Sequence, residues 1–200
     1  ISSYPFSIVY WANWNDNGAV QYVVTQASTG DRYFGGYHNA FGVQETMAIH
    51  TNAVDAGISK SYTLDTTMRL CILVFTSTVS RHIYYGSNVE SSVDTTYVAD
   101  QISSCNRTQV GGIVYNGGGL NFPCASSIAE VHFYARALGD SDYDTLAGGA
   151  LPEDTADWID GWGLEDQSDL VSIGGTRTLT LTGAFHGTAA ATHPIDTTGR

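Results

Sequence analysis

A glycine-broken stretch in the first quarter of the chain gathers side chains that could bind a sugar. The segment DRYFGGYHNAF at residues 31–41 contributes two tyrosines, a histidine and an asparagine, and a second aromatic–amide pair lies further along. A tyrosine ring can stack on the apolar face of a pyranose, while amide groups hydrogen-bond its hydroxyls. We therefore predict a ligand-binding site at Tyr33, Tyr37, His38, Asn39, Tyr115 and Asn116. The alternative is that the tyrosines pack on a sheet with their hydroxyls in water.

The turn at residues 15–18, with the sequence NDNG, is the most oxygen-rich loop beside a strand-like segment. Carboxylate and amide oxygens are the ligands that calcium prefers, so Asp16 and Asn17 are candidate calcium ligands. Asn, Asp and Gly also favour tight turns for purely conformational reasons. A plain hairpin turn without a metal therefore remains the alternative at this position.

The chain lacks a recognisable catalytic constellation. Its five glutamates do not form the alternating acidic pattern that would place two carboxylates about 5 to 10 Å apart on one cleft wall, as glycoside hydrolysis requires. No G-x-S-x-G elbow is present. His132 alternates with Glu130 along a strand-like segment, and we interpret the two as a surface pair on the polar face of a sheet. We therefore expect that the protein is not an enzyme.

The charge balance narrows the class of partner. The chain has 20 acidic residues against 8 basic ones, a net charge of -12. This charge repels phosphate backbones and anionic lipid surfaces, so we expect neither nucleic acid nor membranes as partners. Neutral glycans, cations and other proteins remain open. No apolar stretch approaches the about 18 residues that span a bilayer, and the start at Ile1 leaves open whether the chain is part of a longer one.

The three cysteines cannot all pair with one another. Cys71 lies inside the apolar run LCILVF, which is typical of a small buried hydrophobic residue. Cys105 and Cys124 lie in polar, turn-rich stretches, and the sequence leaves open whether they form a disulfide.

Alternating and aromatic-rich segments predict a chain made almost entirely of strands. They lie at residues 5–14, 20–26, 44–51, 68–76, 79–86, 109–115, 128–135 and 177–183. A further run between residues 26 and 44 is broken by Gly35, Gly36 and Gly42. We expect the segment at 20–26 to form a hairpin with the first one, and the segment at 79–86 to form a hairpin with 68–76. Residues 68–76 are apolar on both faces, which is typical of a central strand covered on both sides.

One short helix is expected at residues 141–147. Ser141 would cap its first turn, Asp142 and Asp144 suit the positive end of its dipole, and Gly148 and Gly149 end it. This helical context explains the acidic residues at 140, 142 and 144 better than a calcium loop does, because Thr145 stands where such a loop needs glycine. The pattern as a whole predicts an all-β chain folded as a two-sheet antiparallel β-sandwich of the jelly-roll kind.

Three stretches carry a resemblance to the laminin G-like domains of the concanavalin A-like lectin and glucanase superfamily. They are PFSIVYWANW at 5–14, LCILVFTSTVSRHIYYGSNV at 70–89, and SSIAEVHFYARALGDSDYDTLAGG at 126–149. In the last stretch, a strand ending at Tyr134 and Arg136 leads through Leu138 into the short acidic helix, as in the family's closing strand and helix. The resemblance implies a laminin G-like β-sandwich at 1–150, followed by a segment at 151–200. We expect its strand at 177–183 to complete the same sandwich, and the alternative is that it begins a second, truncated copy of the domain.

The segment after residue 150 is also similar to one that follows such domains in marine phage and bacterial proteins, which implies a virion surface or an extracellular setting. We therefore expect a non-catalytic recognition module that binds a glycan or another cell-surface ligand. The alternative is a structural virion protein, such as a capsid decoration, spike or fibre domain, which would act through self-association or contacts with virion proteins and bury an apolar patch around Trp158 and Trp162. A glycoside hydrolase is the third interpretation.

Overall fold

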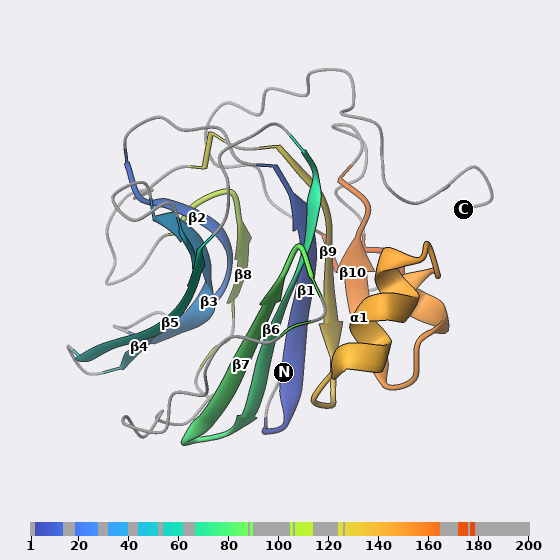
Figure 1. Ribbon diagram of the computed structural model, residues 1–200, viewed down its shortest axis with the longest axis horizontal. Helices are drawn as coiled ribbons and strands as arrows, with labels where there is room; N and C mark the ends of the chain where they lie inside the picture. The colour runs from blue at the N-terminus through green and yellow to red at the C-terminus, as the bar shows by residue number, and fades with distance from the viewer. Residues whose placement is uncertain are drawn as a thin grey trace.

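Two antiparallel sheets stacked face to face form the protein in the computed structural model (Figure 1). The structure describes residues 3–13, 19–27, 32–39, 44–51, 54–61, 67–87, 89, 105, 107–113, 124–125, 127–164, 172–175 and 177–178. Sheet A contains, in spatial order, β10 (Trp158–Trp162), β9 (Ile128–Tyr134), β1 (Phe6–Ala12), β6 (Arg69–Ser77) and β7 (Ser80–Tyr85). Sheet B contains β5 (Val54–Ser61), β4 (Gln44–Thr51), β3 (Arg32–Asn39), β2 (Gln21–Ala27) and β8 (Arg107–Val110). The predicted two-sheet antiparallel β-sandwich is confirmed.

The core lies between the sheets and is rich in aromatic rings. Alternation along β1 sends Phe6, Ile8 and Tyr10 inward, where they join residues of both sheets in one buried cluster. The rings of Phe6 and Phe75 stack with centroids 4.4 Å apart. Phe34 of sheet B meets Phe75 edge-on at 5.8 Å, so aromatic contacts join the two sheets directly.

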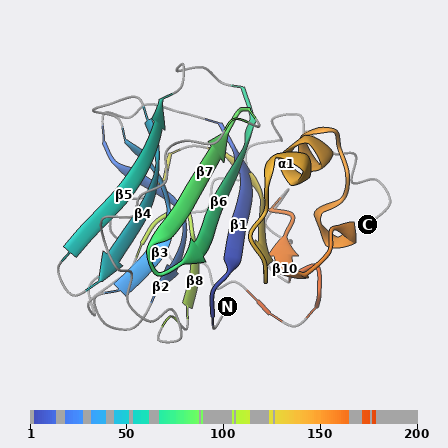
Figure 2. The same ribbon diagram turned by 60° about the horizontal axis from the view of Figure 1, so that its bottom comes forward.

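A second buried layer covers the outer face of sheet A. Helix α1 (Asp140–Ala147) lies on the side of sheet A away from sheet B in both views (Figures 1 and 2). Its Tyr143 and Leu146 pack against Val9, Ile72 and Val74 in this layer. The Tyr84 hydroxyl donates to Asp140 Oδ1 at 3.0 Å, and burial raises the pKa of Tyr143 to about 12. The central strand β6 is therefore covered on both faces, as its sequence predicts.

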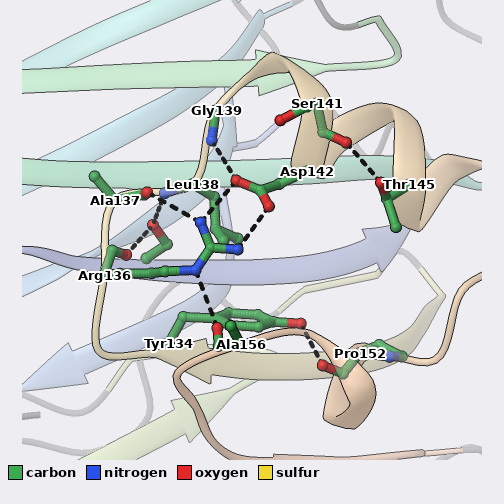
Figure 3. Close-up of polar contacts among 11 residues, drawn as sticks. Tyr134, Arg136, Ala137, Leu138, Gly139, Ser141, Asp142, Thr145, Pro152 and Ala156 are labelled. Carbon is green, nitrogen blue, oxygen red and sulfur yellow. Dashed lines mark hydrogen bonds and ion pairs between the residues drawn. The ribbon is translucent and has the colours of Figure 1, made fainter.

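A polar network joins the end of β9 to the start of α1 (Figure 3). The Arg136 guanidinium donates to both carboxylate oxygens of Asp142, at 2.6 and 2.8 Å, and to the Ala156 carbonyl at 3.0 Å. Asp142 also accepts a hydrogen bond from the Gly139 backbone N–H at 2.8 Å. The hydrogen bonds from Arg136 hold the pKa of Asp142 below its ordinary value, and those to Asp142 raise the pKa of Arg136.

The start of α1 differs from the sequence prediction. The N-cap residue is Gly139, not Ser141, and the side chain that reaches back to the N-cap is that of Asp142. Ser141 lies inside the first turn, where its carbonyl accepts a hydrogen bond from the Thr145 hydroxyl at 2.7 Å. The prediction was wrong because Arg136 positions Asp142, so a carboxylate three residues after Gly139 performs the capping.

The chain after α1 returns to the edge of sheet A. The short 3-10 helix η2 (Pro152–Asp154) leads into β10, which pairs with β9. The backbone N–H of Ile173 donates to the Gly161 carbonyl at 2.8 Å, so the chain at Ile173 lies beside β10. Of the strand predicted at 177–183, only residues 177 and 178 are described, and the prediction that it completes the sandwich stays a prediction.

Three further strand predictions need correction. β1 and β2 are not hairpin partners, because β1 pairs with β6 and β9 while β2 pairs with β3 and β8 in the other sheet. β3 continues through Gly35 and Gly36 without a break. Strands β5 and β10 were not predicted, since VDAGISKS and WIDGW are too rich in small or acidic residues to display a strand pattern. The hairpin of β6 and β7 is confirmed.

Candidate functional site

Three tyrosines gather on the outer face of sheet B, the face turned away from sheet A. We call Tyr22, Tyr33 and Tyr37 the tyrosine cluster. The Tyr22 and Tyr33 hydroxyls are hydrogen-bonded at 2.6 Å, and their rings meet edge-on with centroids 5.4 Å apart. The Tyr37 ring lies tilted by 35° against Tyr22 at 5.1 Å. Tyr22 and Tyr33 are buried, each 6% exposed, whereas Tyr37 is only partly buried.

An irregularity in the pairing of β2 with β3 positions this cluster. Tyr22 pairs with Tyr37, but the register shifts before Val24, which pairs with Gly36. This β-bulge lets both Val23 and Val24 reach the inner core while Tyr22 stays on the outer face. Gly35 makes the close approach possible, because a Cβ there would lie 2.1 Å from the Val24 carbonyl oxygen. In Figure 1, β2 and β3 are curved with their concave side away from sheet A.

Polar residues flank the tyrosine cluster on the same face. The Thr25 hydroxyl donates to Gln109 Oε1 at 3.2 Å, which links β2 to β8. Arg107 is exposed and pairs with Ala27, which in turn pairs with Tyr33. The face thus combines aromatic rings with hydroxyl, amide and guanidinium groups.

The structure brings together only part of the predicted binding site. Tyr33 and Tyr37 lie on the outer face, as a shared site requires. His38 does not, because alternation turns it to the inner face, where it is fully buried. The prediction of His38 as a ligand-binding residue is therefore wrong. Asn39 ends β3, and its side chain lies outside the described residues, as do Tyr115 and Asn116 and the predicted metal ligands Asp16 and Asn17.

Tyr22 is the cluster residue that the sequence analysis missed. Its position on the outer face follows from the β-bulge, which the alternation of Val20–Gln26 does not reveal. Strand pairing could have revealed Tyr22. A strand that pairs with the strand carrying Tyr33 and Tyr37 can place an aromatic residue of its own on the same face. The incorrect hairpin of β1 with β2 hid that partner.

The Glu130–His132 pair is not the surface pair that the sequence suggested. Both side chains are 0% exposed, and His132 Nε2 lies 2.8 Å from Glu130 Oε2. They occupy the outer face of sheet A, where Trp11 and Trp158 surround the imidazole. Substrate therefore has no access to this pair in the described structure. Tyr134 on the same face donates to the Pro152 carbonyl, and burial raises the pKa of its hydroxyl.

Two other expectations are tested by the described residues. Trp162 is 2% exposed inside the core, so it does not contribute to a surface patch, whereas Trp158 is only partly buried where it packs against the second buried layer. All three cysteines are reduced thiols, so Cys105 and Cys124 do not form a disulfide. Among the described residues no three His, Cys, Asp or Glu side chains form a metal-binding group, and no described helix is long and apolar enough to cross a membrane.

The fold is a jelly-roll β-sandwich of the kind found in carbohydrate-binding modules and in the lectin-like domains of sialidases. The family-40 carbohydrate-binding module of the Ruminococcus gnavus intramolecular trans-sialidase, solved with α2,3-sialyllactose, superposes with a TM-score of 0.61 at 15% identity over 72% of this chain and 83% of the module. Domain 4 of the Geobacillus stearothermophilus arabinanase AbnA, solved with arabinotriose, superposes with a TM-score of 0.54 at 12% identity. The match covers 73% of this chain and 68% of the arabinanase domain.

A third similar structure is the botulinum neurotoxin type C protein, whose cell entry depends on two ganglioside molecules. It gives a TM-score of 0.51 at 13% identity, covering 72% of this chain and 36% of the toxin chain. No protein-family model and no curated protein sequence matches this chain. At these identities the likeness establishes the fold.

Proposed function

We propose that the protein is a non-catalytic module that binds a glycan on the outer face of sheet B. The observation that carries the proposal is the tyrosine cluster, in which Tyr22 supports one side of the Tyr37 ring and leaves that ring partly accessible. An accessible ring held in place by a buried neighbour is a platform for the apolar face of a sugar. Gln109, which is partly buried, and the exposed Arg107 supply groups that can bind hydroxyls or an acidic substituent.

The fold neighbours support this choice of ligand class. Two proteins with the same sandwich, at low sequence identity, were solved with sialyllactose and with arabinotriose, and a third depends on gangliosides for cell entry. These ligands include neutral and acidic sugars, so they define a test panel. They do not define one sugar for this chain, because a shared fold does not fix function.

A glycan panel with Tyr37 variants tests the proposal. We expect measurable binding of the wild-type chain to at least one of sialyllactose, arabinotriose or a larger glycan. Tyr37→Ala should weaken that binding about tenfold or more, since an exposed stacking ring contributes on the order of 1 kcal/mol. Tyr37→Phe is the matched control and should retain most of the affinity, because the ring and not the hydroxyl forms the platform.

A second control lies far from the site. Val79, 37% exposed at the β6–β7 turn, can be changed to Ala without touching sheet B. Isothermal titration should give the same affinity for Val79→Ala as for the wild type. Absence of binding to every glycan, or equal affinity of Tyr37→Ala and the wild type, would contradict the proposal. Repeating the titration with calcium and with a chelator tests the predicted role of Asp16 and Asn17.

We also propose the setting that the sequence resemblance implies, which is the surface of a virion or a secreted protein. A module of this kind, with net charge -12, would remain soluble when displayed at high density. Mass spectrometry of purified particles and of culture supernatant would detect the chain in either fraction. Detection in the cell interior alone would contradict this setting.

A further inference from the structure

A buried chain of three side chains links β9 to β10 on the outer face of sheet A. Trp158 Nε1 lies 3.3 Å from His132 Nδ1, and His132 Nε2 lies 2.8 Å from Glu130 Oε2. An indole N–H can only donate a hydrogen bond. His132 Nδ1 must therefore be the acceptor, and Nε2 carries the proton and donates to the Glu130 carboxylate. The contact with Trp158 thus requires a neutral imidazole in a single tautomer.

The surroundings hold the His132 ring in this position. Trp11 meets the ring edge-on with centroids 6.2 Å apart. Gly161 of β10 pairs with His132 across the ladder, and a Cβ on Gly161 would lie 2.1 Å from His132 Nδ1. The imidazole therefore occupies the space that any other residue at position 161 would fill. The strand pairing and the side-chain contact depend on each other.

Other charged or titratable groups near these side chains have partners of their own. The Asp160 carboxylate accepts from the backbone N–H groups of Gly161 and Gly174, at 3.0 and 3.1 Å, and pairs with Arg177 at 3.2 Å. The Tyr134 hydroxyl, which Glu153 faces, donates to a backbone carbonyl. The titratable groups on the strands that carry or adjoin His132 are Glu130 and Tyr134 on β9, Asp160 on β10 and Tyr10 on β1. Asp160 pairs with Phe133 and therefore lies on the other face of sheet A from His132.

We propose that Trp158, His132 and Glu130 form an acid-sensitive clasp that fastens β10 to sheet A at neutral pH and loosens it when His132 takes up a proton. The added proton goes to Nδ1 and turns the acceptor of the Trp158 bond into a second donor. Glu130 stabilises the resulting imidazolium, since the buried pair then carries no net charge. The bond to Trp158 is lost while the rest of sheet A stays folded.

Loss of the clasp has a defined structural consequence. β10 holds Ile173 through its N–H bond to the Gly161 carbonyl, and it holds Gly174 and Arg177 through the bonds of Asp160. Loosening β10 therefore weakens the attachment of these three residues. The inference is independent of the glycan proposal, because the clasp and the tyrosine cluster lie on the outer faces of different sheets.

Nuclear magnetic resonance of the full, isotope-labelled chain tests the clasp without any substitution. As the pH is lowered from about 7.5 to about 4.5, the Trp158 indole N–H resonance should shift in step with the resonances of the His132 ring. Exchange of that indole N–H, relative to the core Trp162 in the same strand, should become about fivefold faster at the acidic end. The amide of Ile173 should lose protection in parallel.

Two results would overturn the clasp. One is a neutral-pH His132 ring that carries its proton on Nδ1. The other is a Trp158 resonance that follows Trp162 through the whole range. Glu130→Gln gives a further test, since it removes the charge that stabilises the imidazolium, and an unchanged response of Trp158 to acid contradicts the role of Glu130. Trp158→Phe keeps an aromatic ring and removes the donor, so the acid-dependent exchange of Ile173 should disappear in this variant.

Discussion

The outer faces of the two sheets differ in how their side chains are used. The outer face of sheet A carries Val9, Ile72 and Val74 beneath α1, and its polar groups, such as Glu130 and His132, are buried and hydrogen-bonded. The outer face of sheet B has no described helix on it and presents the tyrosine cluster with hydroxyl, amide and guanidinium groups. Sheet A thus stabilises the sandwich through both of its faces, whereas the proposed recognition site lies on sheet B.

The largest effect should come from a residue that contacts both sheets. Phe75→Ala removes a fully buried ring that stacks on Phe6 and meets Phe34 of the other sheet. We expect a loss of about 3 to 5 kcal/mol in the free energy of unfolding, measured by chemical denaturation. Val79→Ala at the exposed turn is the control and should change stability by less than about 0.5 kcal/mol. Similar losses for the two variants would contradict the shared aromatic core.

A glycine substitution should damage sheet B alone. Gly35→Ala places a methyl group against the Val24 carbonyl, so we expect about 1 to 3 kcal/mol of destabilisation and a displaced Tyr22. Glycan binding at the tyrosine cluster should fall with it. Gly139→Ala is a matched control, because no atom lies within 4 Å of the position that its methyl group would take and its φ of -126° suits any residue. If both variants unfold at the same denaturant concentration, the bulge does not need Gly35.

The link between β9 and α1 should respond to pH in a defined direction. The depressed pKa of Asp142 means that its ion pair contributes stability above the ordinary carboxyl range and loses it as the pH falls through the folded-state pKa. Asp142→Asn should lower the free energy of unfolding by about 1 kcal/mol near neutral pH. The effect is limited because the side chains of Asp142 and Arg136 are 18% and 27% exposed and are therefore partly screened by solvent. The difference in the free energy of unfolding between the variant and the wild type should become smaller in acid. A constant difference down to about pH 2 would show that the charge of Asp142 is not involved.

The smallest effect should come from Tyr22→Phe. This change removes the hydroxyl bonded to Tyr33 but keeps the ring that supports Tyr37. We expect the free energy of unfolding to fall by about 1 kcal/mol or less. Glycan affinity should change by less than about threefold, because the platform ring stays supported. A loss as large as that of Tyr37→Ala would mean that the Tyr22 hydroxyl itself contacts the ligand.

Some strands of the two sheets could be predicted from the sequence and others could not. β1, β6 and β9 alternate or are apolar on both faces, so local pattern predicts both their existence and their inner faces. β5 and β10 are held by pairing with neighbours, and their own composition gives no strand signal. His38 was misassigned for a related reason, since consecutive residues such as Tyr37 and His38 cannot both face one side of a strand.

Burial of the polar residues was harder still to predict. The alternation of Glu130 with His132 is correct, but nothing local indicates that Trp158, 26 residues further on, would cover the imidazole. The same holds for Tyr22, because the β-bulge in the pairing of β2 with β3 decides on which face of sheet B its side chain lies. Contacts between residues far apart in the chain decide these features, and the local pattern alone does not contain them.

The position of β10 has a consequence for how this protein can be shortened. A chain cut after Gly149 would retain the helix but lose the strand that pairs with β9, and the hydrogen-bonding groups along that side of β9 would meet solvent or another molecule. Unpaired strand edges of this kind recruit further copies. A fragment ending there should therefore associate or precipitate more readily than one extended through residue 178. During synthesis, β10, which ends 15 residues after α1, must leave the ribosome before this edge of the sheet can be paired.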